Sequence, residues 1–301
     1  MKKQVLVARP TFPDVIERLK QYFDVDANPG EVLSQKELHA RLADKDGAFM
    51  AGDVIGETEL KGAPNLKVVS NMAVGFNNFE MHAFDVHGVL GTNTPNVLNE
   101  TTADFSWALM MVAARRVTES EHFLRAGKWV YDAFLGNDVY GSTLGVIGMG
   151  RIRQALARRA SGFNIRVIYH NRSRLSAEIE SELNAEYASK EDLLRHADHV
   201  VLVLPYTKES HHTIGAAEIT LMKPTATLTK IAAAGIDVFE GEPNFNPDFL
   251  LLDNVALTSH IASATESTRR AMTNLAADIS SPDWAKAHAP VTRPTQSTRM
   301  C

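Results

Sequence analysis

The sequence is almost free of cysteine, since Cys301, its last residue, is the only one. A single cysteine cannot form a disulfide within the chain, which fits a reducing compartment. Long apolar runs are also missing. Residues 108–114 are far too few to span a membrane, and residues 5–8 are too few for the core of a signal peptide. We therefore expect a cytoplasmic protein without a membrane partner.

An excess of basic residues is missing as well. The chain has 31 Lys and Arg residues against 36 Asp and Glu residues, which gives a net charge of −5. Because nucleic-acid binding usually needs a basic face, we expect no nucleic-acid partner. Hydrophobic residues make up 45% and charged residues 22%, which is typical of a globular protein. The 301 residues can supply two domains with separate cores.

Short apolar runs alternate with amphipathic segments along the first hundred residues, which is typical of βα units around a parallel sheet. The strands expected there are residues 5–8, 23–25, 47–50, 66–70 and 89–91. A long helix should follow, with Asn99 as its N-cap and no Gly or Pro from 100 to 126. Its apolar middle predicts burial between domains or subunits.

A second set of strands is expected after this helix, at residues 144–147, 166–169, 200–204, 226–228, 233–238 and 255–259. The sequence therefore predicts an α/β protein with two Rossmann-like domains, each built on a parallel sheet. We place a flavodoxin-like domain at residues 1–98, joined by residues 281–301, and the other domain at residues 99–280.

A glycine-rich turn joins a strand to a helix within residues 143–153. Gly148 permits the tight turn, Gly150 lets a pyrophosphate approach the backbone, and the start of the helix offers amide donors. The next strand follows at the distance expected of a βαβ unit, which favours dinucleotide binding. The predicted contacts are Gly148, Met149, Gly150, Arg151 and Ile152. Arg153 occupies the third glycine position, and a turn that binds no nucleotide is the alternative.

The end of the following strand lacks the acidic residue that would contact a ribose hydroxyl in an NAD site. Two arginines and a serine stand there instead and could bind a 2′-phosphate. The pattern therefore favours NADPH over NADH, with the alternative that both arginines are solvated loop residues. The predicted contacts are Asn171, Arg172, Ser173 and Arg174.

Two later strands each lead into a loop with ionisable residues: Asp237, Glu240 and Glu242 in one, His260 in the other. Because the carboxyl ends of strands in an open α/β sheet meet in one crevice, a carboxylate and a histidine could pair there. A carboxylate favours the protonated imidazole and fixes its tautomer, which yields a proton donor near neutral pH. A purely structural histidine is the alternative.

Several segments together resemble the D-isomer-specific 2-hydroxyacid dehydrogenases, namely residues 68–78, 93–103, 148–152, 235–243 and 260–264. The resemblance runs from residue 1 to residue 280 and is greatest to the NADPH-preferring glyoxylate/hydroxypyruvate reductases and 2-ketogluconate reductases. It implies hydride transfer from a nicotinamide to a small 2-keto acid, such as glyoxylate, hydroxypyruvate or 2-ketogluconate. No metal is implied.

The resemblance also implies roles for individual residues. His260 would donate a proton to the keto oxygen with Glu242 as its partner, and the backbone of Val74 and Gly75 would bind the substrate carboxylate.

On the cofactor side, Asp237 would lie beside the nicotinamide carboxamide, and Leu204 and Pro205 would line the adenine. The first domain would be the substrate domain, the second would bind the dinucleotide, and the helix after Asn99 would help to form a homodimer.

The chain departs from the family's pattern after residues 225–229. The family has an Asn-x-x-Arg-Gly segment there, whose arginine grips the substrate carboxylate, and then a crossover helix, whereas here Lys230-Ile-Ala-Ala-Ala follows at once. We expect an internal deletion of about 20 residues. Since a parallel crossover usually takes about 10–12 residues, we also expect that the strands on either side are not neighbours.

Loss of such an arginine usually costs on the order of 10²–10³ in rate. The leading hypothesis is thus a keto-acid reductase whose activity is impaired. The alternatives are a catalytically silent nucleotide-binding protein and a gene product that folds poorly. The tail from residue 281 also differs from the family's usual ending.

Overall fold

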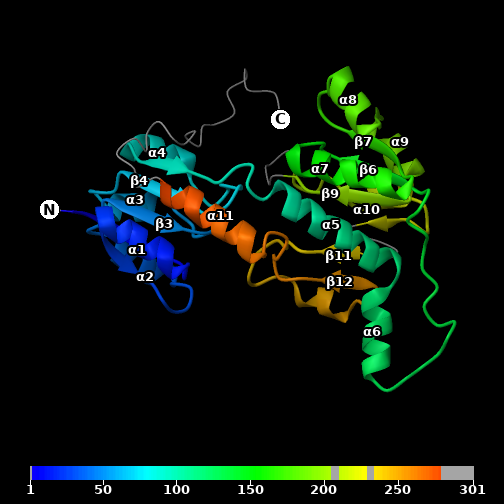
Figure 1. Cartoon of the computed structure of the whole chain (residues 1–301), viewed down its shortest axis with the longest axis horizontal. Coiled ribbons are helices and arrows are strands. Elements are labelled where there is room, and N and C mark those ends of the chain that lie inside the picture. The colour runs from blue at the N-terminus through cyan, green and yellow to red at the C-terminus, as the bar shows by residue number, and fades with distance from the viewer. Residues whose placement is uncertain (1, 205–209, 229–233, 279–301) are drawn as a thin grey trace. The chain divides into compact units, whose positions relative to one another are not determined.

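The chain divides into two units, shown in Figure 1. Unit 1 comprises Met1–Leu98 and the residues from Thr265 onward, and unit 2 comprises Asn99–Ala264. The structure is a computed structural model that describes residues 2–204, 210–228 and 234–278. Among the helices of these residues, none is both long and apolar enough to cross a membrane.

Unit 1 is built on a five-stranded parallel sheet with the order β2-β1-β3-β4-β5. This order is that of flavodoxin-like folds, as the sequence predicted. The strands are β1 (Lys3–Val7), β2 (Phe23–Ala27), β3 (Gly47–Met50), β4 (Val68–Asn71) and β5 (Leu90–Thr92). The helices are α1 (Pro13–Tyr22), α2 (Gln35–Leu42), α3 (Glu57–Gly62), α4 (Met81–His87) and α11 (Glu266–Ala277).

Helix α11 belongs to unit 1, although we expected residues 99–280 to form one domain. Its alanines Ala276 and Ala277 are buried in the same apolar cluster as Val7 and Phe49. The hydroxyl of Ser70, on β4, donates a hydrogen bond of 3.0 Å to the carbonyl of Ala276. The small side chains let the helix lie close to the sheet, and this packing corrects the expected boundary. Residues 281–301 lie outside the described part of the chain.

Unit 2 is built on a seven-stranded parallel sheet with the order β12-β11-β10-β9-β6-β7-β8. The chain starts in the middle at β6, continues outward on one side and then returns to the other, which is the doubly wound pattern of dinucleotide-binding folds. The strands are β6 (Thr143–Ile147), β7 (Arg166–His170), β8 (Ala185–Tyr187), β9 (His199–Leu202), β10 (Thr227–Leu228), β11 (Ala234–Ile236) and β12 (Val255–Leu257). The helices are α5 (Asn99–Ala114), α6 (Val117–Arg125), α7 (Arg151–Ala160), α8 (Ala177–Leu183), α9 (Lys190–His196) and α10 (Ala216–Leu221).

The expected long helix is two helices, because the chain turns at Arg116. This residue has a left-handed backbone (φ 52°) and separates α5 from α6. Its guanidinium donates two hydrogen bonds to the carboxylate of Glu119, at 3.0 and 2.6 Å, which fastens the start of α6. Within unit 2, α5 packs on β11, where Leu109 fills the space that a side chain at Gly235 would need.

Strands β10 and β11 are neighbours, contrary to our expectation. They pair in parallel through Leu228 and Ala234 alone. The end of one strand therefore lies beside the start of the next, and the chain does not have to retrace the length of a strand. The usual crossover length assumes strands that overlap along several residues, and it does not apply to this single pair.

Candidate active site

The glycine turn of unit 2 lies where β6 passes into α7, between strands at which the order of the sheet reverses. Gly148 has a left-handed backbone (φ 84°), and a side chain there would overlap Leu204. The Gly148 amide donates to the His170 carbonyl at 2.8 Å, and the Met149 amide donates to Asn171 Oδ1 at 2.5 Å. The turn is thereby fixed to the end of β7.

The start of α7 offers backbone amides to a ligand. The first bond of the helix runs from the Gln154 amide to the Gly150 carbonyl at 2.9 Å. The amides of Arg151 and Ile152 therefore have no acceptor within the helix. The first turn of α7 also lacks an acidic side chain, so the positive end of the helix dipole is not neutralised by its own residues.

Arg153, in the third glycine position, is only 7% exposed. Burial lowers the pKa of its guanidinium to about 10, so the group stays charged at neutral pH. Its Nε has no hydrogen-bond partner among the described residues. A Cβ atom added at Gly150 would lie 3.0 Å from Arg153 Nη2, which places the guanidinium against the turn.

The loop after β7 holds the residues predicted to select the cofactor. Arg174 donates hydrogen bonds of 2.8 and 2.7 Å to the carboxylate of Glu180, which also accepts a bond of 2.6 Å from the Tyr169 hydroxyl. The Arg174 guanidinium and then the Tyr169 hydroxyl lower the pKa of Glu180 to about 2. Arg172 and Ser173 are exposed, and Arg172 has no ion pair within the described ranges. The two arginines therefore differ: Arg174 is already engaged, and Arg172 is available.

The structure brings His260 and Glu242 into contact. His260 Nδ1 lies 2.9 Å from Glu242 Oε2, and Glu242 Oε1 accepts a hydrogen bond of 2.6 Å from the Phe239 amide. The carboxylate thus orients the ring through Nδ1. The His260 side chain is 61% exposed, and its Nε2 contacts no partner in the part of the chain that the structure describes. This nitrogen can reach a ligand.

Asp237 fastens the loop that carries His260. Its carboxylate accepts hydrogen bonds from the Thr258 hydroxyl at 2.7 Å and from the amides of Ile261 and Ala262 at 2.8 and 3.0 Å. The Asp237 carbonyl accepts a further bond of 2.9 Å from the His260 amide. These contacts indicate a positioning role, which the sequence analysis did not anticipate.

In unit 1, the loop after β4 presents the predicted substrate contacts Val74 and Gly75. Asn71 Nδ2 donates to the Gly75 carbonyl and Asn93 Nδ2 to the Val74 carbonyl, each at 2.8 Å. Among the described residues, the amides of Val74 and Gly75 have no acceptor, so they can bind an anion. Neither asparagine was among the predicted site residues, although polar residues at the ends of apolar strands were a usable signal.

Leu204 packs against the glycine turn as noted, whereas Pro205 lies outside the described residues.

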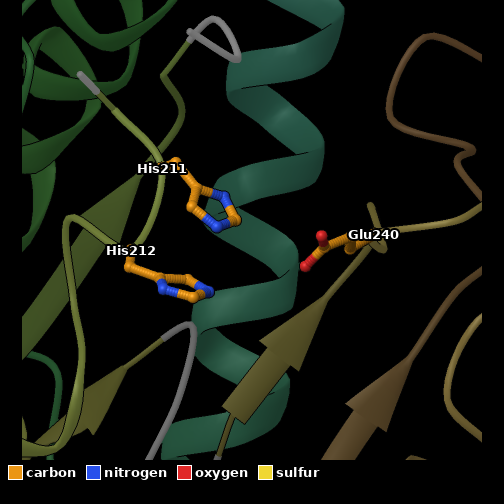
Figure 2. A group of neighbouring side chains, drawn as sticks. All are labelled: His211, His212 and Glu240. Atoms are coloured by element: carbon orange, nitrogen blue, oxygen red, sulfur yellow. The ribbon is translucent and has the colours of Figure 1, made fainter. Parts of the chain in front are cut away.

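A further group, His211, His212 and Glu240, could hold a metal ion. Figure 2 shows the Glu240 carboxylate directed toward the two imidazole rings, and the ligand atoms lie within 4.8 Å of one another. The two rings stack with their centres 3.7 Å apart.

Comparison with known proteins shows the family to which the chain belongs. The family model for the D-isomer specific 2-hydroxyacid dehydrogenase, NAD binding domain, matches residues 107–230. The chain is 40% identical to the glyoxylate reductase of Thermococcus gammatolerans over 306 aligned positions, which cover 92% of this chain and 91% of the relative. It is 42% identical to the glyoxylate reductase of Aeropyrum pernix, again over 92% and 91% of the two chains.

Solved structures are also similar. An NADPH-dependent glyoxylate/hydroxypyruvate reductase from Sinorhizobium meliloti, in complex with NADP and malonate, has a TM-score of 0.82 and 28% identity, covering 99% of this chain and 98% of that one. A glyoxylate reductase from Paecilomyes thermophila has a TM-score of 0.84 and 26% identity, covering 96% and 98%.

Two features of these matches bear on the missing arginine segment. The match to the family model ends at residue 230, where the family's pattern breaks off in the sequence. The alignment to the Thermococcus relative spans 306 positions, which exceeds the 301 residues of the chain. The relative therefore has residues that this chain lacks.

Proposed function

Because the chain belongs to the D-isomer specific 2-hydroxyacid dehydrogenase family of NAD(P)-dependent oxidoreductases, we propose that it reduces glyoxylate, hydroxypyruvate or 2-ketogluconate to the 2-hydroxy acid of D configuration, or to glycolate in the case of glyoxylate. The names of the relatives at about 40% identity make glyoxylate the first substrate to test. The observation that carries the proposal is the contact of 2.9 Å between His260 Nδ1 and Glu242 Oε2.

The proposed chemistry divides between hydride and proton. When bound, the reduced nicotinamide supplies a hydride to the keto carbon. His260 donates the proton to the keto oxygen from Nε2, while Glu242 holds the ring through Nδ1 and stabilises its protonated form. The free amides of Val74 and Gly75 are the donors proposed for the substrate carboxylate.

The proposed cofactor is NADPH rather than NADH. Gly148, Gly150 and the amides at the start of α7 would accommodate the pyrophosphate, as in other folds of this type. Arg172 and Ser173 are the groups available to the 2′-phosphate, since Arg174 is engaged by Glu180. Leu204 would lie on the adenine side.

The activity is proposed to be weaker than that of relatives that have the arginine segment. A second candidate function, a catalytically silent nucleotide-binding protein, is favoured by that same absence. By the family's pattern we also propose a cytoplasmic homodimer.

The test follows the oxidation of NADPH by absorbance with each of the three keto acids. The chain is compared with a variant in which an Asn-x-x-Arg-Gly segment and a short helix, about 20 residues, are inserted after Thr229. We expect the insertion to raise kcat/KM by about 10²–10³. Equal rates would contradict the argument about the arginine. NADPH binding without turnover in either chain would favour the silent alternative.

A further inference from the structure

Arg153 is a buried cation that nothing in the described part of the protein neutralises. It is 7% exposed, its Nε has no hydrogen-bond partner, and no acidic side chain described by the structure forms an ion pair with it. Such a state is unfavourable, because the Nε of the guanidinium has lost its hydration without gaining an acceptor. An anion placed beside this side chain would therefore be favourable, and the described residues do not supply one.

The guanidinium lies at the place where the turn would receive a phosphate. A Cβ atom at Gly150 would be 3.0 Å from Arg153 Nη2, and one at Gly148 would be 3.5 Å from the same atom. These missing side chains leave the room that a pyrophosphate uses when it approaches the backbone of such a turn. Arg153 thus borders the space that the glycines keep open.

A second positive group faces the same place. The ten-residue helix α7 begins at Arg151, and its first turn has no acidic residue. The N-terminal end of its dipole and the Arg153 charge therefore repel each other unless an anion lies between them. One anionic group of a ligand would attract both the N-terminal end of α7 and the Arg153 guanidinium.

We propose that Arg153 binds the pyrophosphate of the dinucleotide directly. It occupies the third glycine position of the turn, and a glycine there would contribute no charge. The assignment rests on the proposed function. Arg153 would act on the part that NADPH and NADH share, whereas Arg172 would act on the 2′-phosphate alone. The opposite possibility is that the Arg153 side chain fills the turn and hinders the ligand. Removal of the side chain would then strengthen dinucleotide binding, whereas our proposal predicts that it weakens binding.

The test measures the Kd of the full-length protein for NADPH, NADH and ADP-ribose by titration calorimetry. In Arg153→Gln we expect all three affinities to fall by about 10- to 100-fold, and Arg153→Lys to recover part of the loss. The matched control is Arg158→Gln, which removes the same charge from an exposed position of the same helix and should change each Kd by less than about twofold.

A melting experiment separates ligand binding from a structural role. Without ligand, Arg153→Gln should melt at a temperature equal to or higher than the wild-type protein, since it removes an unpaired buried charge, but it should gain less from added NADPH. Unchanged or tighter binding by Arg153→Gln would overturn the assignment. If the wild-type chain bound no dinucleotide at all, the proposed function would fail, and this assignment with it.

Discussion

The middle and the edge of the unit 2 sheet hold their functional loops in different ways. At the middle, β6 and β7 pair from Thr143↔Arg166 to Ile147↔His170, and the glycine turn continues directly from these strands. Toward the edge, β10 and β11 share only the pair Leu228↔Ala234. Strands β11 and β12 pair over three residues, from Ala234↔Val255 to Ile236↔Leu257, and the carboxylates of Asp237 and Glu242 further fasten the loops that follow them.

This difference explains how His260 and Glu242 can be in contact although the connection between β10 and β11 is short. Strand register shapes the turn, so its geometry depends on the sheet. The His260 loop is shaped by the pairing of β11 with β12 and by hydrogen bonds that two carboxylates accept, so its geometry does not depend on the connection between β10 and β11. The edge can therefore lose a connecting segment and still bring His260 and Glu242 together.

Removal of the proposed proton donor alone tests whether the two regions are independent. We expect His260→Asn to lower kcat by about 10²–10⁴-fold, because His260 is the proposed proton donor to the keto oxygen, while the Kd for NADPH stays within about twofold. Steady-state rates and calorimetry on the same preparation give both numbers. His196→Asn, at an exposed histidine of α9, is the control and should leave kcat unchanged. A parallel loss of NADPH binding would show that the two regions are not independent.

Asp237→Asn tests whether the edge loop is held by side chains. In the variant, the side-chain NH2 group would take the place of Oδ2 and face the backbone N–H of Ala262. The loop would lose the hydrogen bond between these two groups, and His260 would be misplaced. We expect kcat to fall by about 10- to 100-fold with little change in the Kd for NADPH.

The role that the family implies for Asp237, beside the nicotinamide carboxamide, makes a different prediction. In that case the Kd for NADPH and NADH should rise together with the loss of kcat. If the Kd and kcat changed by equal factors, we would conclude that Asp237 contacts the cofactor and does not merely position the loop.

The sequence was enough to predict what depends on short-range pattern. Both parallel sheets, the glycine turn and the meeting of Glu242 with His260 follow from apolar runs and from loops at strand ends. It was not enough where a tertiary contact decides. Helix α11 joins unit 1 through the packing of its alanines, and β10 lies beside β11 because their register is a single pair. Neither contact has a local signature.

The same limit applies to the site. The pattern placed Arg172 and Arg174 together at the end of β7, but only the fold brings Glu180 to Arg174 and, within the described residues, leaves Arg172 without an ion pair. Burial of Arg153 could not be read from the sequence either, since an arginine is usually exposed.

The two arginines of the middle region provide a smaller, more selective test. We expect Arg172→Gln to raise the Kd for NADPH by about 10-fold and to change the Kd for NADH by less than about twofold, because only NADPH has a 2′-phosphate. Arg174→Gln should change the preference less, since Glu180 already holds that side chain. The ratio of the two Kd values is the measurement, and a larger shift from Arg174 than from Arg172 would reverse the assignment.

The smallest expected effect concerns the join between the two regions. His199, on β9, is fully buried, and its Nδ1 lies 2.5 Å from the hydroxyl of Thr227 on β10. Burial lowers the pKa of His199 in the folded protein below the usual 6.5. As the pH falls below about 6.5, the unfolded chain therefore binds a proton that the folded chain does not, and the free energy of unfolding decreases.

Comparing the pH dependence of unfolding with that of His199→Gln isolates this effect. The variant cannot take up the proton, so between pH 7.5 and pH 5.5 its free energy of unfolding should fall by about 1 kcal/mol less than that of the wild-type chain. Urea unfolding at the two pH values measures the difference. Strand β10 has only two residues, and His199 contacts one of them, Thr227. Parallel pH profiles would mean that the pKa of His199 is not lowered in the folded protein.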